Sequence, residues 1–218
     1  METPVLEGPL VLPASGQAPR SMVILLHGYG SNGDDLIGLV PYWRGALPDT
    51  VFLSPNAPQP CPGAPGGRQW WSLTSFSPEA RAAGARQAAP ILDAFIDSQL
   101  AAYGLTEDRL ALVGFSQGTM VALHVGPRRE RRLAGIVGYS GMLADPDSPA
   151  EALRSRPPVL LVHGDADPMV PVAALGQAQA VLEPLGFEVA THISRGLGHS
   201  IDEAGVRLGE QFLSRVLA

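Results

Sequence analysis

Lysine is absent from this chain, and all 15 basic residues are arginine. Without a lysine amine, a pyridoxal Schiff base and a Walker-type phosphate loop are both excluded. Charged residues are also scarce, at 17% of the chain, and the acidic ones are in excess, so the net charge is −6. A nucleic-acid binder needs a basic surface that neutralises phosphates. We therefore expect no nucleic-acid partner, and binding to anionic membranes is disfavoured for the same reason.

Cysteine and long hydrophobic runs are also nearly missing. The single cysteine, Cys61, excludes an intramolecular disulfide framework and a cysteine cluster for a metal. Since no candidate base lies near it in the sequence, we interpret Cys61 as a bystander thiol rather than a nucleophile. No apolar run approaches the roughly 18–20 residues that cross a bilayer, and the N-terminus lacks the features of a signal peptide. We expect a cytoplasmic protein with no stable membrane insertion.

Apolar residues are plentiful, at 45% of 218 residues, which is enough for a sizeable core in one domain spanning residues 1–218. Short apolar runs, typical of strands buried on both faces, alternate with amphipathic stretches typical of helices. The expected strands are 22–26, 51–54, 110–114, 133–139, 159–163 and 188–193, with a further edge strand at 10–12, and the expected helices are 79–103, 117–125, 172–182 and 201–217. This order predicts an α/β fold with a mostly parallel sheet.

Residues 55–68 interrupt this pattern. The stretch is so rich in proline and glycine that we expect no regular structure in it. A long loop of this kind is often functional. It leads into Trp70 and Trp71, for which two interpretations stay open: the indoles cover the core, or they form a wall of a binding site.

Residues 114–118 read GFSQG and fit the pattern G-x-S-x-G. The motif lies between an expected strand and an expected helix, which is the context of a nucleophile elbow. In such a turn the serine, here Ser116, is exposed above the sheet at a helix N-terminus. An ordinary strand-to-helix turn is the alternative.

A serine nucleophile needs a base and an orienting acid, which follow it in the order Ser, Asp, His in this architecture. Of the five histidines, only His199 lies on a glycine-rich loop after the last strand, and we predict it to be the base. We expect structural positions for the other four, His27, His124, His163 and His192. Asp165 and Asp167 both follow the strand at 159–163, and spacing alone does not decide between them.

The oxyanion of an acyl-transfer reaction needs two backbone donors. We predict that these are the amide of Gln117, directly after the serine, and the amide of Tyr29, in the glycine-rich loop after the strand at 22–26. The same loop is compatible with a turn before a helix that Asp34 or Asp35 caps.

Four ordered motifs, LLHGYGSNGDDL, GFSQG, HGDADPMVP and GLGHSI, together resemble the bacterial carboxylesterases that are grouped with phospholipases and acyl-protein thioesterases in the α/β-hydrolase superfamily. The resemblance runs from about Met22 to the C-terminal helix. It implies an α/β-hydrolase fold with helices on both faces of the sheet, and it selects Asp167 as the acid. It also implies that residues 68–73 lie beside the acyl site, where Trp71 replaces the usual phenylalanine and could narrow the pocket.

The resulting hypothesis is a serine carboxylesterase with the triad Ser116, Asp167 and His199, acting on short-to-medium-chain esters without metal or organic cofactor. Only residues 140–158 separate two expected strands, so we expect no large cap domain. An acyl groove is expected along five apolar residues, for which ordinary packing is the alternative: Trp71, Met142, Leu143, Met169 and Leu197. Competing functions are a thioesterase or lysophospholipase with the same triad, a silent binding protein and a serine peptidase. The sequence leaves a homodimer open, and the arginines at 128–132 are interpreted as a solvated helix end.

Overall fold

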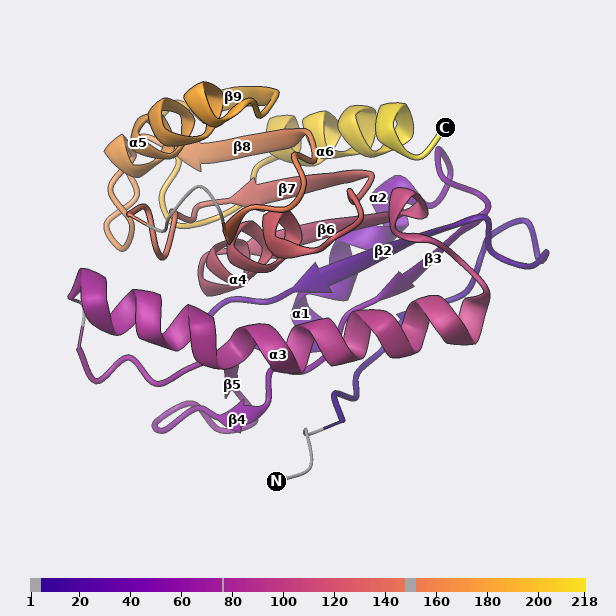
Figure 1. Ribbon diagram of the computed structural model, residues 1–218, viewed down its shortest axis with the longest axis horizontal. Coiled ribbons are helices and arrows are strands. Elements are labelled where there is room, and N and C mark those ends of the chain that lie inside the picture. The colour runs from indigo at the N-terminus through magenta and orange to yellow at the C-terminus, as the bar shows by residue number, and fades with distance from the viewer. Residues whose placement is uncertain (1–4, 76, 148–151) are drawn as a thin grey trace.

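The computed structural model describes residues 5–75, 77–147 and 152–218, which form a central sheet with helices packed on it (Figure 1). The seven strands of this sheet lie in the order β1-β3-β2-β6-β7-β8-β9, and every neighbouring pair is parallel except β1 with β3. They are β1 (Leu10–Val11), β2 (Ser21–Leu26), β3 (Thr50–Leu53), β6 (Leu110–Phe115), β7 (Gly135–Tyr139), β8 (Val159–Gly164) and β9 (Val189–Ser194). The α-helices are α1 (Gly33–Leu36), α2 (Val40–Trp43), α3 (Pro78–Tyr103), α4 (Gln117–Val125), α5 (Ala173–Leu182) and α6 (Glu203–Val216).

Alternate residues of each central strand enter two separate hydrophobic cores, because successive side chains of a strand point to opposite faces. On one face, residues such as Ile24 and Leu112 pack with α3, α4 and α5. On the other, residues such as Val23 and Val113 pack with α1, α2 and α6. In Figure 1 the long helix α3 crosses the near face of the sheet, and α6 lies on the far side. The α/β-hydrolase fold with helices on both faces of a mostly parallel sheet is therefore confirmed, and the residues that the structure describes contain no large cap.

Two details of the N-terminal third differ from the sequence predictions. Residues 55–68 do contain regular structure, since β4 (Gln59–Pro60) and β5 (Arg68–Gln69) pair as a small antiparallel sheet. The pairing tolerates proline because a two-stranded sheet has open edges, where the missing donor leaves no ladder bond unmade. Helix α1 is capped by Asn32, whose side chain accepts from the Asp35 amide, rather than by either aspartate.

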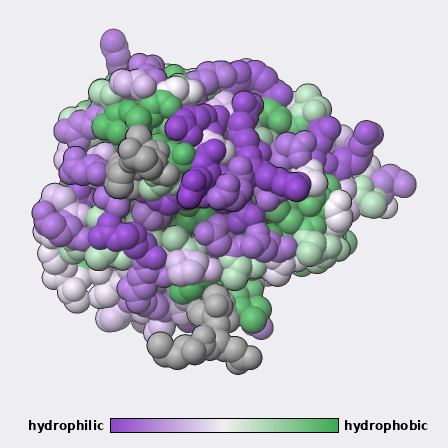
Figure 2. Space-filling view, in the orientation of Figure 1, coloured by the Kyte–Doolittle hydropathy of each residue, from purple (hydrophilic) through white to green (hydrophobic). Residues whose placement is uncertain are grey.

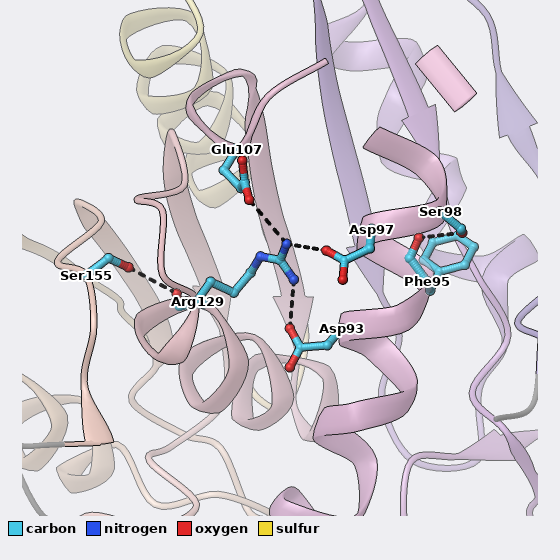
Figure 3. A network of polar contacts seen from close by, with 8 residues as sticks. Asp93, Phe95, Asp97, Ser98, Glu107, Arg129 and Ser155 are labelled. Carbon is cyan, nitrogen blue, oxygen red and sulfur yellow. Dashed lines mark hydrogen bonds and ion pairs between the residues drawn. The ribbon is translucent and has the colours of Figure 1, made fainter. Parts of the chain in front are cut away.

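The arginine cluster at 128–132 is not simply a solvated helix end. The Arg129 side chain is only 9% exposed and makes ion pairs with Asp93 and Asp97 of α3 and with Glu107 (Figure 3). The guanidinium lies 2.8 Å from the Asp93 carboxylate. Arg129 therefore cross-links the loop after α4 to α3, on the near face of the sheet.

Hydrophilic side chains cover most of this near face, and smaller hydrophobic patches lie between them (Figure 2). Over the residues that the structure describes, no helix combines the length and the apolar character that crossing a membrane requires.

Candidate active site

Ser116 occupies the turn between β6 and α4. Its backbone has φ 52° and ψ −114°, a positive-φ conformation that is uncommon for a residue with a side chain. The flanking glycines are required by close packing. A Cβ on Gly114 would lie 2.4 Å from the Thr119 nitrogen, and one on Gly118 would lie 1.8 Å from the Leu26 carbonyl oxygen. The sequence thus folds here into the tight elbow that its G-x-S-x-G pattern predicts.

Two further predicted residues meet at the same edge of the sheet. Asp167 follows β8 and His199 follows β9, and His199 Nδ1 lies 2.7 Å from Asp167 Oδ2. Because an ionised carboxylate only accepts, Nδ1 carries the hydrogen, and Nε2 of the neutral ring keeps a lone pair. The His199 ring also packs against Phe115, the residue before Ser116, with ring centroids 4.9 Å apart.

The Asp167 carboxylate is held in its ionised form. Its side chain is fully buried. Burial alone would raise its pKa, but hydrogen bonds from the Val170 amide, the His199 imidazole and the Met169 amide outweigh that effect and hold the pKa below its ordinary value. The two amides donate to Oδ1, at 2.9 Å for Val170 and 2.8 Å for Met169. Oδ2 is thereby left to face His199.

Asp165, the other aspartate of this loop, has a different neighbour. Its carboxylate accepts a hydrogen bond from the Gly196 amide at 2.6 Å, and the residue is exposed. It therefore ties the loop after β8 to the loop that carries His199. The structure brings Asp167, not Asp165, into contact with the imidazole.

The Gln117 side chain connects the elbow to the tryptophan segment. Its Oε1 accepts from the Trp70 amide at 2.9 Å, and its Nε2 donates to the Trp71 carbonyl, also at 2.9 Å. His27 makes further hydrogen bonds in the same region. Its Nδ1 donates to the Gly28 carbonyl at 2.7 Å, and its Nε2 accepts from the Ala57 amide at 2.9 Å.

Burial lowers the pKa of His27 although its bond to the Gly28 carbonyl opposes that shift. A neutral imidazole thus fixes the loop that carries Tyr29. This agrees with the structural position expected for His27.

Known proteins share this architecture over almost the whole chain. The sequence model of a family described as phospholipase/carboxylesterase matches residues 9–217. The chain belongs to the phospholipase/carboxylesterase family. The crystal structure of esterase PE8 is 44% identical, with a TM-score of 0.93, and the match covers 98% of this chain and all of that one.

Two further known proteins are similar to this chain over most of their length. Acyl-protein thioesterase 1 of Gibberella zeae is 30% identical over 96% of this chain and 95% of its own. Esterase YpfH of Escherichia coli K12 is 27% identical over 90% of this chain and 83% of its own. These relatives support hydrolysis of a carboxylic ester as the class of reaction for this chain.

A cavity of about 350 Å³ is lined by both Ser116 and His199. The other lining residues are Tyr29, Leu73, Arg81, Gln117, Met120, Met142, Met169, Val170 and Pro171. Most of them are apolar, and Met169 is largely exposed at the surface. Met142 and Met169 are thus placed at the cavity, as the sequence hypothesis expects.

Three residues expected along the acyl groove lie elsewhere. Leu143 lines a separate, smaller cavity together with His124. Leu197 does not line the cavity at Ser116; its carbonyl accepts from the Ala166 amide. Trp71 is 2% exposed and belongs to the hydrophobic core, where its ring packs on α3.

The indole of Trp71 therefore does not narrow the pocket. Its bulk is accommodated by Gly84 of α3, since a Cβ there would lie 2.3 Å from the ring. Trp70 is also fully buried, and its Nε1 donates to the His27 carbonyl at 3.0 Å. Of the two interpretations left open for Trp70 and Trp71, the first holds: both indoles cover the core.

Some residues that line the cavity were not predicted, although the sequence contains features that point to them. Met120 lies four residues after Ser116, one helical turn along α4, and so shares its face. Val170 and Pro171 belong to the HGDADPMVP motif already assigned to the triad. Arg81, in the first turns of α3, has no comparable signal.

Two further findings concern Cys61 and metals. The neighbouring thiol of Cys61, a buried residue, raises the pKa of the Tyr29 hydroxyl. Over the described parts of the chain, no three His, Cys, Asp or Glu side chains are grouped so that they could hold a metal ion.

Proposed function

We propose that the chain is a serine carboxylesterase with Ser116 as nucleophile, His199 as general base and Asp167 as the acid that orients it. One observation supports this most directly. A serine in a strained elbow at a helix N-terminus shares a cavity with an imidazole whose Nδ1 is fixed by a buried carboxylate. A purely structural role of the serine or the histidine would not require this arrangement.

The reaction then follows from the fixed tautomer. Ser116 Oγ attacks the ester carbonyl carbon while His199 Nε2 takes the hydroxyl proton. The carbonyl electron pair moves to oxygen, and Asp167 stabilises the imidazolium that has formed. His199 returns the proton to the leaving alcohol as the C–O bond breaks, which leaves an acyl-serine. Water repeats the cycle and releases the carboxylic acid.

The tetrahedral oxyanion would accept from the amides of Gln117 and Tyr29. Gln117 is the first residue of α4, and the first amides of a helix have no intrahelical acceptor. The loop before Tyr29 approaches the serine closely, because a Cβ on Gly28 would lie 3.4 Å from the Ser116 Cβ. Loss of one such donor typically costs about 10²–10³ in kcat.

The size and lining of the cavity favour short-to-medium acyl chains. A volume of about 350 Å³ is near the lower end of ligand pockets, which is roughly 300–1,000 Å³. Its methionines are flexible and adapt to aliphatic chains of different shape. A thioesterase with the same triad is the second candidate, because the relative from Gibberella zeae is named an acyl-protein thioesterase.

Two neighbouring aspartates provide a matched test of the triad. Asp167→Asn should lower kcat for a 4-nitrophenyl ester by about 10⁴, because the amide favours the wrong tautomer of His199. Asp165→Asn changes the same residue type in the same loop and should retain most activity. Equal effects of the two variants, or full activity of Asp167→Asn, would refute the assignment.

The nucleophile and the substrate class can be tested together. A fluorophosphonate probe should label the protein at Ser116 and should not label Ser116→Ala; failure to label the parent protein would favour a silent binding protein. A series of oxygen esters and matched thioesters of increasing acyl length should then peak at short-to-medium esters. A clear preference for thioesters at every length would favour the thioesterase.

A further inference from the structure

His163 is a buried histidine that the mechanism above does not use. It lies at the end of β8, and its side chain is 2% exposed. Its Nε2 is 2.9 Å from the Val170 carbonyl oxygen. Because a carbonyl only accepts, Nε2 must carry the hydrogen, which fixes the tautomer of this ring.

The same nitrogen lies 3.3 Å from Asp167 Oδ2, the oxygen that His199 Nδ1 contacts at 2.7 Å. Both backbone polar groups of Val170 are hydrogen-bonded: its amide donates to Asp167 Oδ1, and its carbonyl accepts from His163. His163, Val170 and Asp167 thus form a closed set of contacts between the end of β8 and the loop that follows.

We propose that His163 is a positioning residue for Asp167, because it holds the turn 167–170 in the shape that directs Oδ2 toward His199. This inference rests on the proposed function. The 2.9 Å bond to the Val170 carbonyl is the directed contact, so we assign the effect to orientation of the loop rather than to the charge of the ring.

Few other charges act on this carboxylate. Within the described residues, the titratable groups that contact Asp167 are His163 of β8 and His199 of the loop after β9. The nearby Asp165 carboxylate is bound to the Gly196 amide, and Asp202 caps α6 at the Gly205 amide. A change in the pH dependence after substitution of His163 would therefore report on the Asp167–His199 pair.

The test compares His163→Leu, which has no donor, with His163→Gln, whose side-chain amide can still donate to the Val170 carbonyl. All rates are divided by the number of sites that a fluorophosphonate titrates, so that loss of folded protein does not count. His163→Leu should lower kcat per site by about 10- to 100-fold, by analogy with residues that orient metal ligands, whose loss has effects of this size. His163→Gln should recover most of this loss.

The pH profile gives a readout that a purely structural role would not move. A loosened Asp167 stabilises the His199 imidazolium less, so the acidic limb of kcat/KM should shift to lower pH by roughly half a unit or more in His163→Leu. His163→Gln should keep the parent limb. An unchanged limb, or a limb displaced to higher pH, would overturn the proposal.

A double-mutant cycle separates this inference from the proposed function. If His163 acts through Asp167, His163→Leu should change kcat by less than about 2-fold in an Asp167→Asn background. The same loss in both backgrounds would overturn the positioning role. Full activity of Asp167→Asn alone would instead refute the triad.

Discussion

Replacing Gly84 with alanine should destabilise this protein, although the same exchange inside a helix is normally favourable. Alanine is about 1 kcal/mol better than glycine in a helix interior. At this position of α3, however, the new Cβ would lie 2.3 Å from two carbon atoms of the Trp71 ring. Carbon atoms in contact normally stay about 3.5–4.0 Å apart, so the ring or the helix would have to move by more than about 1 Å.

The magnitude follows from the two opposing effects. Overpacking a core costs about 1–3 kcal/mol, and the close approach to a fully enclosed ring favours the upper end. After subtraction of the helix-propensity gain, we expect a net loss of about 2 kcal/mol in the free energy of unfolding. For a chain of this size, that loss lowers Tm by roughly 4–8 °C.

Two variants serve as controls. Gly176 of α5 is exposed, and a Cβ there meets nothing within 4 Å, so Gly176→Ala should stabilise by about 0.5–1 kcal/mol. Trp71→Phe removes part of the obstructing ring, so Gly84→Ala should cost less in that background. Urea unfolding followed by far-ultraviolet circular dichroism measures the parent and the four variants with one probe. A Gly84→Ala protein as stable as its parent, or a cost that Trp71→Phe does not reduce, would refute the packing argument.

Other predictions concern charge and pH. Arg129→Met should lower the free energy of unfolding by roughly 2–3 kcal/mol, because it leaves the partly buried carboxylates of Asp93 and Glu107 without their cation. Arg215→Met removes an exposed ion pair with Glu188 and a cation–π contact with Phe212, and should cost less than about 1 kcal/mol. Equal losses in urea unfolding would contradict this. Burial, helped by the nearby Arg128, lowers the pKa of His124 from 6.5 to about 4. The unfolded chain therefore binds a proton that the fold does not, so stability should fall by up to about 3 kcal/mol as pH drops through this window. His124→Gln should flatten part of that fall, and an unaltered profile would count against it.

The sequence was sufficient to predict the central strands and the long helices. Continuous apolar runs such as 22–26 and 159–163 are typical of strands in a parallel sheet covered on both faces, and the structure has them there. The elbow was also predictable, because the glycines around Ser116 are demanded by contacts within a few residues of the turn and with the neighbouring strand.

The residues that line the cavity were harder to predict from the sequence, because their positions depend on contacts between distant segments. Trp71 was a candidate for the wall of a binding site, but its ring packs in the core, where Gly84 leaves room for it. Leu143 and Leu197 are apolar, as an acyl groove requires, and lie close in the sequence to the expected site. The conformation of their loops nevertheless keeps them out of the lining of the cavity at Ser116. The choice between Asp165 and Asp167 likewise depends on which carboxylate the turn after β8 directs toward His199, which spacing does not specify.

The residues around the cavity come from two separate parts of the fold, and this has a practical consequence for redesign. The elbow, the carboxylate and the imidazole are all anchored at strand ends, whereas Leu73 and Arg81 come from the segment that leads into α3 and from its first turns. Grafting this entry segment from a relative with different acyl preference could therefore retune selectivity while the proposed catalytic groups keep their alignment. Directed libraries aimed at positions 73 and 81 would explore chain length and polarity with little risk to turnover itself.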